Sequence, residues 1–213
     1  MEYPKIETLY NRGDNFKVDT TAIREAEFEL IKRWLVTEKI DGTNIRVTWH
    51  SDTKQVTLGG RTDNALIYSP LVTYLHKIFT VDKFSEIAEF ADSDVILFGE
   101  GYGPKIQKGG GNYRADVSFR LFDVRVGDWW LEPVTMSDVA SCLGCSTVPS
   151  HGFIEDLPRS ADELRLITGN ISATSTADGG PGCQPEGIVA RPWPLLLDRA
   201  GRRVMWKLKF KDF

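Results

Sequence analysis

One lysine lies between two acidic residues in the stretch TEKIDGTNIRV, residues 37–47. Alternate side chains of a β-strand project from the same face, so Lys39, Asp41 and Thr43 would share one face while Glu38 points to the other. Neighbouring carboxylates favour the charged ammonium form of a lysine. The stretch alone therefore favours a surface ion pair, and a nucleophilic Lys39 would need further positive charge beside it.

Positive charge is clustered in two parts of the chain. One cluster lies within residues 105–125 and consists of Lys105, Lys108, Arg114, Arg120 and Arg125. The other consists of Arg199, Arg202, Arg203, Lys207, Lys209 and Lys211. The formal net charge of −4 argues only weakly against a nucleic-acid partner, because such binding depends on local clusters. Taken alone, each cluster is more typical of a solvated face.

The composition is that of an ordinary globular protein. The chain has 213 residues, of which 41% are apolar, and we expect one domain over residues 1–213. The N-terminus carries no apolar signal region, and no apolar run approaches the roughly 18 residues of a membrane span. We therefore expect a cytoplasmic protein that does not bind membranes.

Three cysteines, an odd number, do not form a disulfide framework. Cys142 and Cys145 make a C-x-x-C pair that, with His151 and Cys183, offers four residues of zinc-ligand type. The second pair is poorly spaced, which argues against a zinc site. We expect three buried or loop thiols.

Strand patterns dominate the chain. Partial alternation with β-branched and aromatic residues predicts strands at 33–40, 44–50, 55–60, 94–100, 117–126, 187–193 and 202–210. Helices are expected at 69–79, 82–90 and 160–167, the first and last beginning with a serine cap. Strands and helices without strict alternation indicate an α+β fold with mostly antiparallel sheets flanked by helices.

One segment is too rich in Gly, Ser and Thr to predict packing. Residues 169–185 read GNISATSTADGGPGCQP and lead directly to Glu186. Such a composition predicts a flexible loop, either an insertion or an active-site lid.

Five further motifs follow Lys39 in a fixed order. They are GGR ending at Arg61, LFGEGYG around Glu100, SFRLFDV with Phe122 and Asp123, PEGIVAR around Glu186, and MWKLKF with Lys207 and Lys209. A K-x-D-G match alone is weak, but the ordered series from about residue 36 to 211 resembles the signature of covalent nucleotidyltransferases. That superfamily includes ATP-dependent DNA ligases, RNA ligases and messenger-RNA capping enzymes. EKIDGTN and FGEGYGPKIQKG are most similar to the nick-sealing RNA ligases of phages and of kinetoplastid RNA editing.

The resemblance implies a nucleotidyltransferase domain with an ATP-grasp-like fold, and ATP with Mg²⁺ or Mn²⁺ as cofactors. It also implies that Lys39 attacks the α-phosphorus of ATP, carries AMP and passes it to a 5′-phosphate end for joining to a 3′-hydroxyl. A lysine of pKa near 10.4 is neutral only about one part in two thousand at pH 7. A divalent ion with the triphosphate would supply the positive charge that Glu38 and Asp41 oppose.

The resemblance also assigns the other motif residues. Lys207 and Lys209 would contact the α-phosphate, where charge accumulates in the transition state. Phe122 would stack on adenine, and Phe119 would lie on the same side only if the strand bulges. Glu186 would bind metal. The remaining nucleotide contacts would come from Glu38, Asp41 (partly through metal-bound water), Gly42, Asn44, Arg61 and Glu100. Nucleic acid, as RNA ends or a nicked RNA duplex, would meet Arg61, Lys105, Lys108 and Arg114.

Three features depart from the family pattern. Asp41 stands where phage enzymes often have His, and Arg191 stands where a lysine is common. After the last lysine motif we expect neither an OB-fold nor a helical domain, since the sequence ends at Phe213. A minimal ligase, a truncated chain or a partner that supplies the missing module would each explain this.

Two other readings remain open. One is a DNA ligase core or a capping-type guanylyltransferase. The other is a non-catalytic nucleotide- or nucleic-acid-binding protein on the same fold. The GTN and GPKIQK stretches favour an RNA ligase, which would be phage-encoded if the nearest resemblance holds.

Overall fold

The computed structural model describes residues 1–213, whose contacts divide the chain into two compact units. Unit 1 contains residues 1–3 and 41–148, and unit 2 contains residues 4–40 and 149–213. The chain passes from unit 2 to unit 1 between Ile40 and Asp41. The expectation of one nucleotidyltransferase domain over the whole chain stays a prediction.

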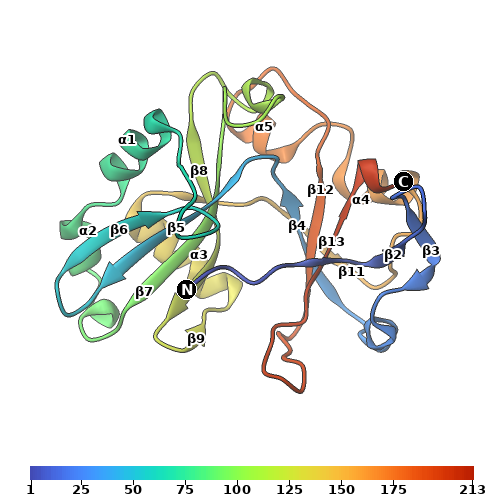
Figure 1. The fold of residues 1–213 in the computed structure, drawn as a ribbon, viewed down its shortest axis with the longest axis horizontal. Coiled ribbons are helices and arrows are strands. Elements are labelled where there is room, and N and C mark those ends of the chain that lie inside the picture. Colours follow the sequence, from blue (N-terminus) through green and yellow to red (C-terminus); the bar gives the residue numbers. More distant parts are fainter. The chain divides into compact units, whose positions relative to one another are not determined.

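Unit 1 is built on a six-stranded sheet (Figure 1). Its strands are β5 (Thr43–His50), β6 (Gln55–Gly59), β7 (Val95–Tyr102), β8 (Ser118–Val126), β9 (Trp129–Trp130) and β10 (Ser146–Thr147). The order is β10-β8-β7-β5-β6, with β9 paired to β8, and only β10 runs parallel to its neighbour. Alternating buried residues of β5, namely Ile45, Val47 and Trp49, face the core of this unit.

Helices α1 (Ser69–Ile78), α2 (Val81–Ser85) and α3 (Pro133–Leu143) contribute to that core. Two 3₁₀ turns, η2 (Ala88–Phe90) and η3 (Gly110–Asn112), complete the unit. The Trp49 ring stacks on Phe84 with centroids 5.5 Å apart, and its indole N–H donates to the Phe90 carbonyl at 3.0 Å. The indole therefore buries its apolar body while its polar group is satisfied.

Unit 2 is built on a five-stranded sheet in the order β1-β13-β12-β4-β11. These strands are β1 (Glu7–Thr8), β4 (Trp34–Lys39), β11 (Ser150–Ile154), β12 (Gly187–Pro192) and β13 (Trp206–Lys209). Strands β1 and β13 are parallel, and the other pairs are antiparallel. A separate hairpin joins β2 (Tyr10–Arg12) to β3 (Val18–Ile23).

One face of the unit 2 sheet forms a second core. Trp34 and Trp206 are fully buried there, with ring centroids 5.5 Å apart. Helix α4 (Ala161–Thr168) packs on it through Leu164. The remaining helical segments are α5 (Ala173–Ala177), η1 (Ala26–Leu30) and η4 (Phe210–Asp212).

The predicted α+β class with mostly antiparallel sheets is confirmed, and each predicted strand overlaps an observed one. The last strand begins at Trp206 rather than residue 202, because the chain before it turns back through a bridge between Leu197 and Arg203. Ser160 caps α4 as expected, whereas Ser69 lies inside α1, whose cap position is Tyr68. Helix α3 was missed, although Pro133 at its start and Gly144 at its end are typical boundary residues.

The prediction that residues 169–185 form a flexible loop is wrong. Residues 173–177 form α5, and the side chains of Ser172, Thr174 and Ser175 are fully buried. The polar composition was misleading because these groups make hydrogen bonds inside the unit rather than with solvent.

We find no helix whose length and hydropathy would suit it to crossing a membrane.

Gly187 should tolerate no side chain, because a Cβ there would lie 2.1 Å from the Leu208 carbonyl oxygen. We expect Gly187→Ala to lower the free energy of unfolding by about 1–3 kcal/mol through overpacking. Gly13→Ala, in the same unit, is the matched control, since its nearest neighbour would lie at 3.6 Å. Urea denaturation of both variants checks this, and equal stabilities would contradict it.

Candidate active site

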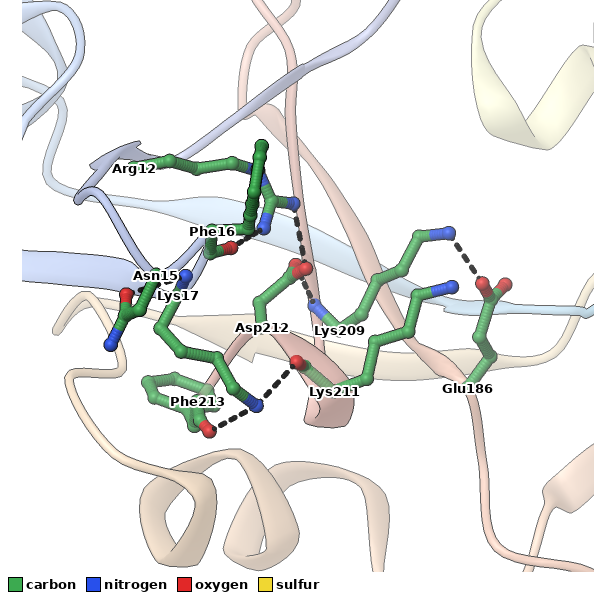
Figure 2. Close-up of polar contacts among 9 residues, drawn as sticks. All are labelled: Arg12, Asn15, Phe16, Lys17, Glu186, Lys209, Lys211, Asp212 and Phe213. Carbon is green, nitrogen blue, oxygen red and sulfur yellow. Dashed lines mark hydrogen bonds and ion pairs between the residues drawn. The ribbon is translucent and has the colours of Figure 1, made fainter.

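Three strands of unit 2 bring a carboxylate between two lysines. Gly187 pairs with Lys39 of β4 on one side and with Lys209 of β13 on the other. Glu186, just before Gly187, therefore lies at the ends of both neighbouring strands. Its carboxylate accepts hydrogen bonds from Lys39 Nζ at 2.6 Å and from Lys209 Nζ at 2.5 Å. Figure 2 shows the contact between Glu186 and Lys209.

The two faces of this sheet have opposite character. Lys39 and Lys209 project from the same face as Thr37, Val189 and Lys207, as their pairing across β4, β12 and β13 requires. All five are partly exposed. The residues between them, such as Ile188 and Leu208, are fully buried on the core face. Alternation thus places Lys39, Lys207 and Lys209 on one face of the sheet, and it places the apolar core residues of β13 on the other.

Lys207 is the lysine whose charge the surroundings oppose most clearly. Its pKa is lowered from the ordinary 10.5, first by burial and then by repulsion from Lys209 and Lys39. Three lysines beside the single Glu186 carboxylate leave this face net positive. Such a surface suits an anionic group such as a phosphate.

Glu38 points to the opposite face from Lys39. Its side chain is 2% exposed, and its carboxylate accepts from Ser172 Oγ at 2.5 Å and from the Thr174 backbone N–H at 3.1 Å. Ser172 is also the N-cap of α5, since its hydroxyl accepts from Ser175 N–H. Glu38 therefore holds the segment that leads to Glu186, and its expected contact with a nucleotide stays a prediction that this geometry does not favour.

The surroundings of Glu38 include two other titratable groups. Burial lowers the pKa of His151, and the nearby Glu38 charge opposes that shift. Burial also raises the pKa of the Cys183 thiol, with Glu38 adding to the effect. Both groups are therefore held towards their neutral forms beside the Glu38 carboxylate.

In unit 1, Asn44 and Glu100 are direct partners on β5 and β7, so their side chains share one face. Asn44 Oδ1 is buried and has no hydrogen-bond partner. Gly42 lies close by, and a Cβ there would sit 2.3 Å from the Gly101 carbonyl and 2.9 Å from Glu100 Cγ. Asn44 and Glu100 thus place an amide oxygen without a hydrogen-bond partner beside a carboxylate.

Asp41 is the first residue of the long segment of unit 1 and is exposed. Its backbone N–H donates to the Tyr113 hydroxyl at 3.1 Å, and Gln107 Nε2 donates to the Gly42 carbonyl at 2.9 Å. Sequence reasoning missed the roles of Tyr113 and Gln107, although Gln107 lies in the GPKIQK stretch. Their hydrogen bonds connect the backbone that follows Lys39 to the loop at residues 103–117.

Phe122 lies at a bulge in β8. Asp123 pairs with Phe98 and Leu121 pairs with Gly99, which leaves Phe122 as the extra residue. The Phe122 side chain is partly exposed, and its ring meets Tyr3 edge-on at 5.0 Å. Phe119 is instead a core residue with 1% exposure. The strand does bulge, yet Phe122 remains the accessible aromatic residue.

The predicted RNA-contacting cations are in unit 1. Arg61 is exposed in the turn after β6, and Lys105 and Lys108 are exposed in the loop at 103–117. Arg114 of the same loop is partly exposed and pairs with Asp116 at 2.6 Å. Three of the four residues therefore belong to one loop.

The three cysteines are free, and the expectation of buried or loop thiols is wrong for Cys142. Cys142 is exposed on α3, Cys145 follows that helix with its pKa raised to about 12 by burial, and Cys183 belongs to unit 2. Across residues 1–213, no three His, Cys, Asp or Glu side chains are grouped as metal ligands.

The pKa shift of Lys207 predicts a pH-dependent stability. Because the folded pKa is lowered, the protonated form costs stability at neutral pH, and stability rises with pH between the folded pKa and 10.5. We expect Lys207→Gln to raise the free energy of unfolding at pH 7, with the gain shrinking as pH approaches 10.5. Urea denaturation at several pH values measures this, with exposed Lys211→Gln as control. A gain that does not change with pH would contradict it.

Ser172 and Ser160 offer a matched pair of helix caps. Each accepts a backbone N–H at 3.1 Å, but only Ser172 also donates to a buried carboxylate. We expect Ser160→Ala to cost about 1 kcal/mol and Ser172→Ala to cost about 2–3 kcal/mol. Thermal and urea unfolding measure both, and a Ser172 variant no less stable than the Ser160 variant would refute the role given to Glu38.

Comparisons with known proteins agree with this geometry. A family model described as RNA ligase matches residues 32–209. A search of curated proteins found no match.

Among solved structures, the Naegleria gruberi RNA ligase with PPi is similar, with a TM-score of 0.64 and 18% identity over 98% of this chain. A mutant of that ligase with AMP and Mn has a TM-score of 0.63 and 18% sequence identity over 97% of this chain. Another mutant with ATP and Mn has a TM-score of 0.59 and 19% sequence identity over 99% of this chain. The protein spans 56%, 61% and 64% of these three chains. The likeness confirms the nucleotidyltransferase fold of RNA ligases, and the family match over residues 32–209 shows that the protein belongs to the RNA ligase family.

Proposed function

We propose that the protein is an ATP-dependent RNA ligase that works through a covalent lysyl-AMP intermediate on Lys39. The observation that supports this best is the Glu186 carboxylate bonded to both Lys39 and Lys209 in a chain of the RNA ligase family. Lys39 lies 147 residues before Glu186 in the chain and Lys209 lies 23 residues after it, and both lysines meet at this one carboxylate.

The first step forms a bond between Lys39 Nζ and the α-phosphorus of ATP. The neutral amine donates its lone pair, the bond to the β-phosphate oxygen breaks, and pyrophosphate leaves. Lys39 then carries AMP as a phosphoramidate. A 5′-phosphate end of RNA takes the AMP from Lys39, and a 3′-hydroxyl displaces AMP to form the phosphodiester.

Lys39 must lose a proton before it can attack. In the structure its amine donates to Glu186, the arrangement expected of an ammonium. Glu186 is an acidic residue bonded to it, and a carboxylate completed by phosphate oxygens and water suits Mg²⁺ or Mn²⁺. Glu186, with Asp41 through water, would hold that ion. The ion would supply positive charge that favours the neutral amine and offsets the triphosphate. The Naegleria enzyme structures with ATP or AMP and Mn support this cofactor choice.

Lys207 and Lys209 would bind the α-phosphate oxygens. Both project from the face that carries Lys39, and that face has excess positive charge. The pKa of Lys207 is lowered first by burial and then by repulsion from Lys209 and Lys39, and an incoming phosphate would offset both effects. Their contribution is therefore electrostatic stabilisation prepared before the reaction.

Residues of unit 1 would bind the nucleoside. Phe122 offers an accessible ring for adenine, and Glu100 would accept hydrogen bonds from ribose hydroxyls. Asn44 Oδ1, buried without a partner, gains one when a nucleotide hydroxyl or a water on the ion donates to it. Gly42 has no side chain, which lets its backbone lie directly against the Gly101 carbonyl and the Glu100 side chain.

RNA would contact Arg61, Lys105, Lys108 and Arg114, the cations of the turn after β6 and of the loop at 103–117. The substrate class we favour is a nicked RNA duplex, as in the nick-sealing branch, which would make RNA repair the biological role. Binding through phosphates should weaken steeply with salt.

Covalent labelling tests the proposed chemistry. We expect radiolabelled ATP, but not GTP, to leave label on the protein after denaturing electrophoresis with Mn²⁺ present. Lys39→Ala should lose the label, whereas Lys54→Ala, an exposed lysine outside the site, should keep it. Label with GTP would indicate a guanylyltransferase, and label on Lys39→Ala would remove Lys39 from its role.

The adenine platform is tested by nucleotide affinity. We expect Phe122→Ala to weaken ATP binding by about 1–3 kcal/mol through lost stacking. Trp129→Ala, which removes another exposed aromatic residue of unit 1, should leave affinity unchanged. Calorimetric titration measures both, and an unchanged affinity in the Phe122 variant would place adenine elsewhere.

A further inference from the structure

Lys209 is held through its backbone as well as through its side chain. Asp212 is only 1% exposed, and its carboxylate accepts the Lys209 backbone N–H at 2.9 Å (Figure 2). The Phe210 N–H donates to the Glu186 carbonyl at 3.0 Å. One turn, η4, therefore fixes the backbones of both residues whose side chains form the Lys209–Glu186 ion pair.

Asp212 is paired in turn with Arg12 of the β2–β3 hairpin. Arg12 Nη2 donates to Asp212 Oδ1 at 2.7 Å, while Arg12 Nη1 donates to the Phe16 carbonyl. The guanidinium thus bridges the hairpin turn and the buried carboxylate, as Figure 2 shows. A buried carboxylate without such a partner would be costly, so the ion pair with Arg12 offsets the cost of burying Asp212.

A second cation of the hairpin binds the same turn differently. Lys17 Nζ donates to the carbonyl oxygens of Lys211 at 3.1 Å and Phe213 at 2.9 Å. Neither of these hydrogen bonds involves Lys209 or Asp212. It therefore tethers the turn without acting on the lysine itself, which makes it a useful comparison for Arg12.

We propose that Arg12 and Asp212 are positioning residues that set the reach of Lys209 towards the α-phosphate. The inference rests on the proposed function, because it assigns these residues to the adenylylation step. Neither residue touches the nucleotide. Both lie outside residues 32–209, so the family match does not include them. The hairpin at residues 10–23 would thereby be part of the machinery that orients the phosphate-binding lysine.

The main test is the single-turnover rate at which Lys39 takes up AMP from ATP. We expect Asp212→Ala and Arg12→Ala to lower that rate by about 10- to 100-fold, the size of effect that small misplacements produce. Asp212→Asn should recover part of the loss, because its amide oxygen can still accept the Lys209 N–H. Lys17→Ala should stay within about threefold of the wild type, since only the tether is removed.

Asp198→Asn is a matched control for carboxylate chemistry. Asp198 also accepts backbone N–H groups, from Ala200 and Arg202, and pairs with the Arg202 guanidinium, but it lies between β12 and β13 and is remote in sequence from η4. We expect a normal rate in this variant. Melting curves of every variant ensure that rates are compared well below unfolding.

A double-mutant cycle separates positioning from general stability. The probe is α,β-methylene ATP, whose bridging carbon cannot leave, so that only binding is measured. We expect Asp212→Ala to weaken binding about tenfold in the wild-type background and to have no further effect in Lys209→Ala, because the two changes act through the same amine. Equal losses in both backgrounds, or no loss in the wild type, would overturn the inference.

The two proposals fail in different ways. If the wild type never forms the lysyl adduct, the proposed function is wrong, while the binding cycle still decides whether Asp212 acts through Lys209. If the adduct forms normally in both Asp212→Ala and Arg12→Ala, the positioning role is wrong and the proposed function stands.

Discussion

The carboxylate of Glu186, shared by Lys39 and Lys209, is the interaction on which the rest of unit 2 depends. Three strands must pair in one register for these side chains to meet. Gly187 makes that pairing possible because it has no Cβ, which would collide with the Leu208 carbonyl oxygen. This single carboxylate bonds to both lysine amines at once. It is also well placed to exchange one of them for a metal ion, and the proposed chemistry needs that exchange.

Strand β4 separates two tasks by alternation alone. Lys39 faces the charged surface, and the preceding Glu38 faces inwards, where it holds Ser172 and Thr174. Glu38, the acidic neighbour of Lys39 in the sequence, is thus hydrogen-bonded to other residues. The unfavourable electrostatic interaction is found instead at Lys207, whose burial beside two other lysines lowers its pKa. Such locally unfavourable interactions are common in sites that a protein has arranged for ligand binding or activity.

Sequence patterns predicted seven strands, which overlap β4 to β8, β12 and β13, because strand alternation depends on neighbours along the chain. They failed at residues 169–185, where serines and threonines read as a loop but are buried around Glu38, a partner more than 130 residues away. The same reason hid Arg12 and Asp212, which are 200 residues apart. The bulge at Phe122 needed the register of β7 against β8, and the division into two units is a property of contacts rather than of composition.

The central claim is that the amine of Lys39 becomes bonded to AMP. Peptide mass spectrometry after incubation with ATP and Mn²⁺ tests it most directly, under mild alkaline digestion that preserves a phosphoramidate. The account predicts AMP on the peptide that contains Lys39 and on no other. AMP attached to Lys207 or Lys209, or no adduct at all in protein that binds ATP, would contradict it.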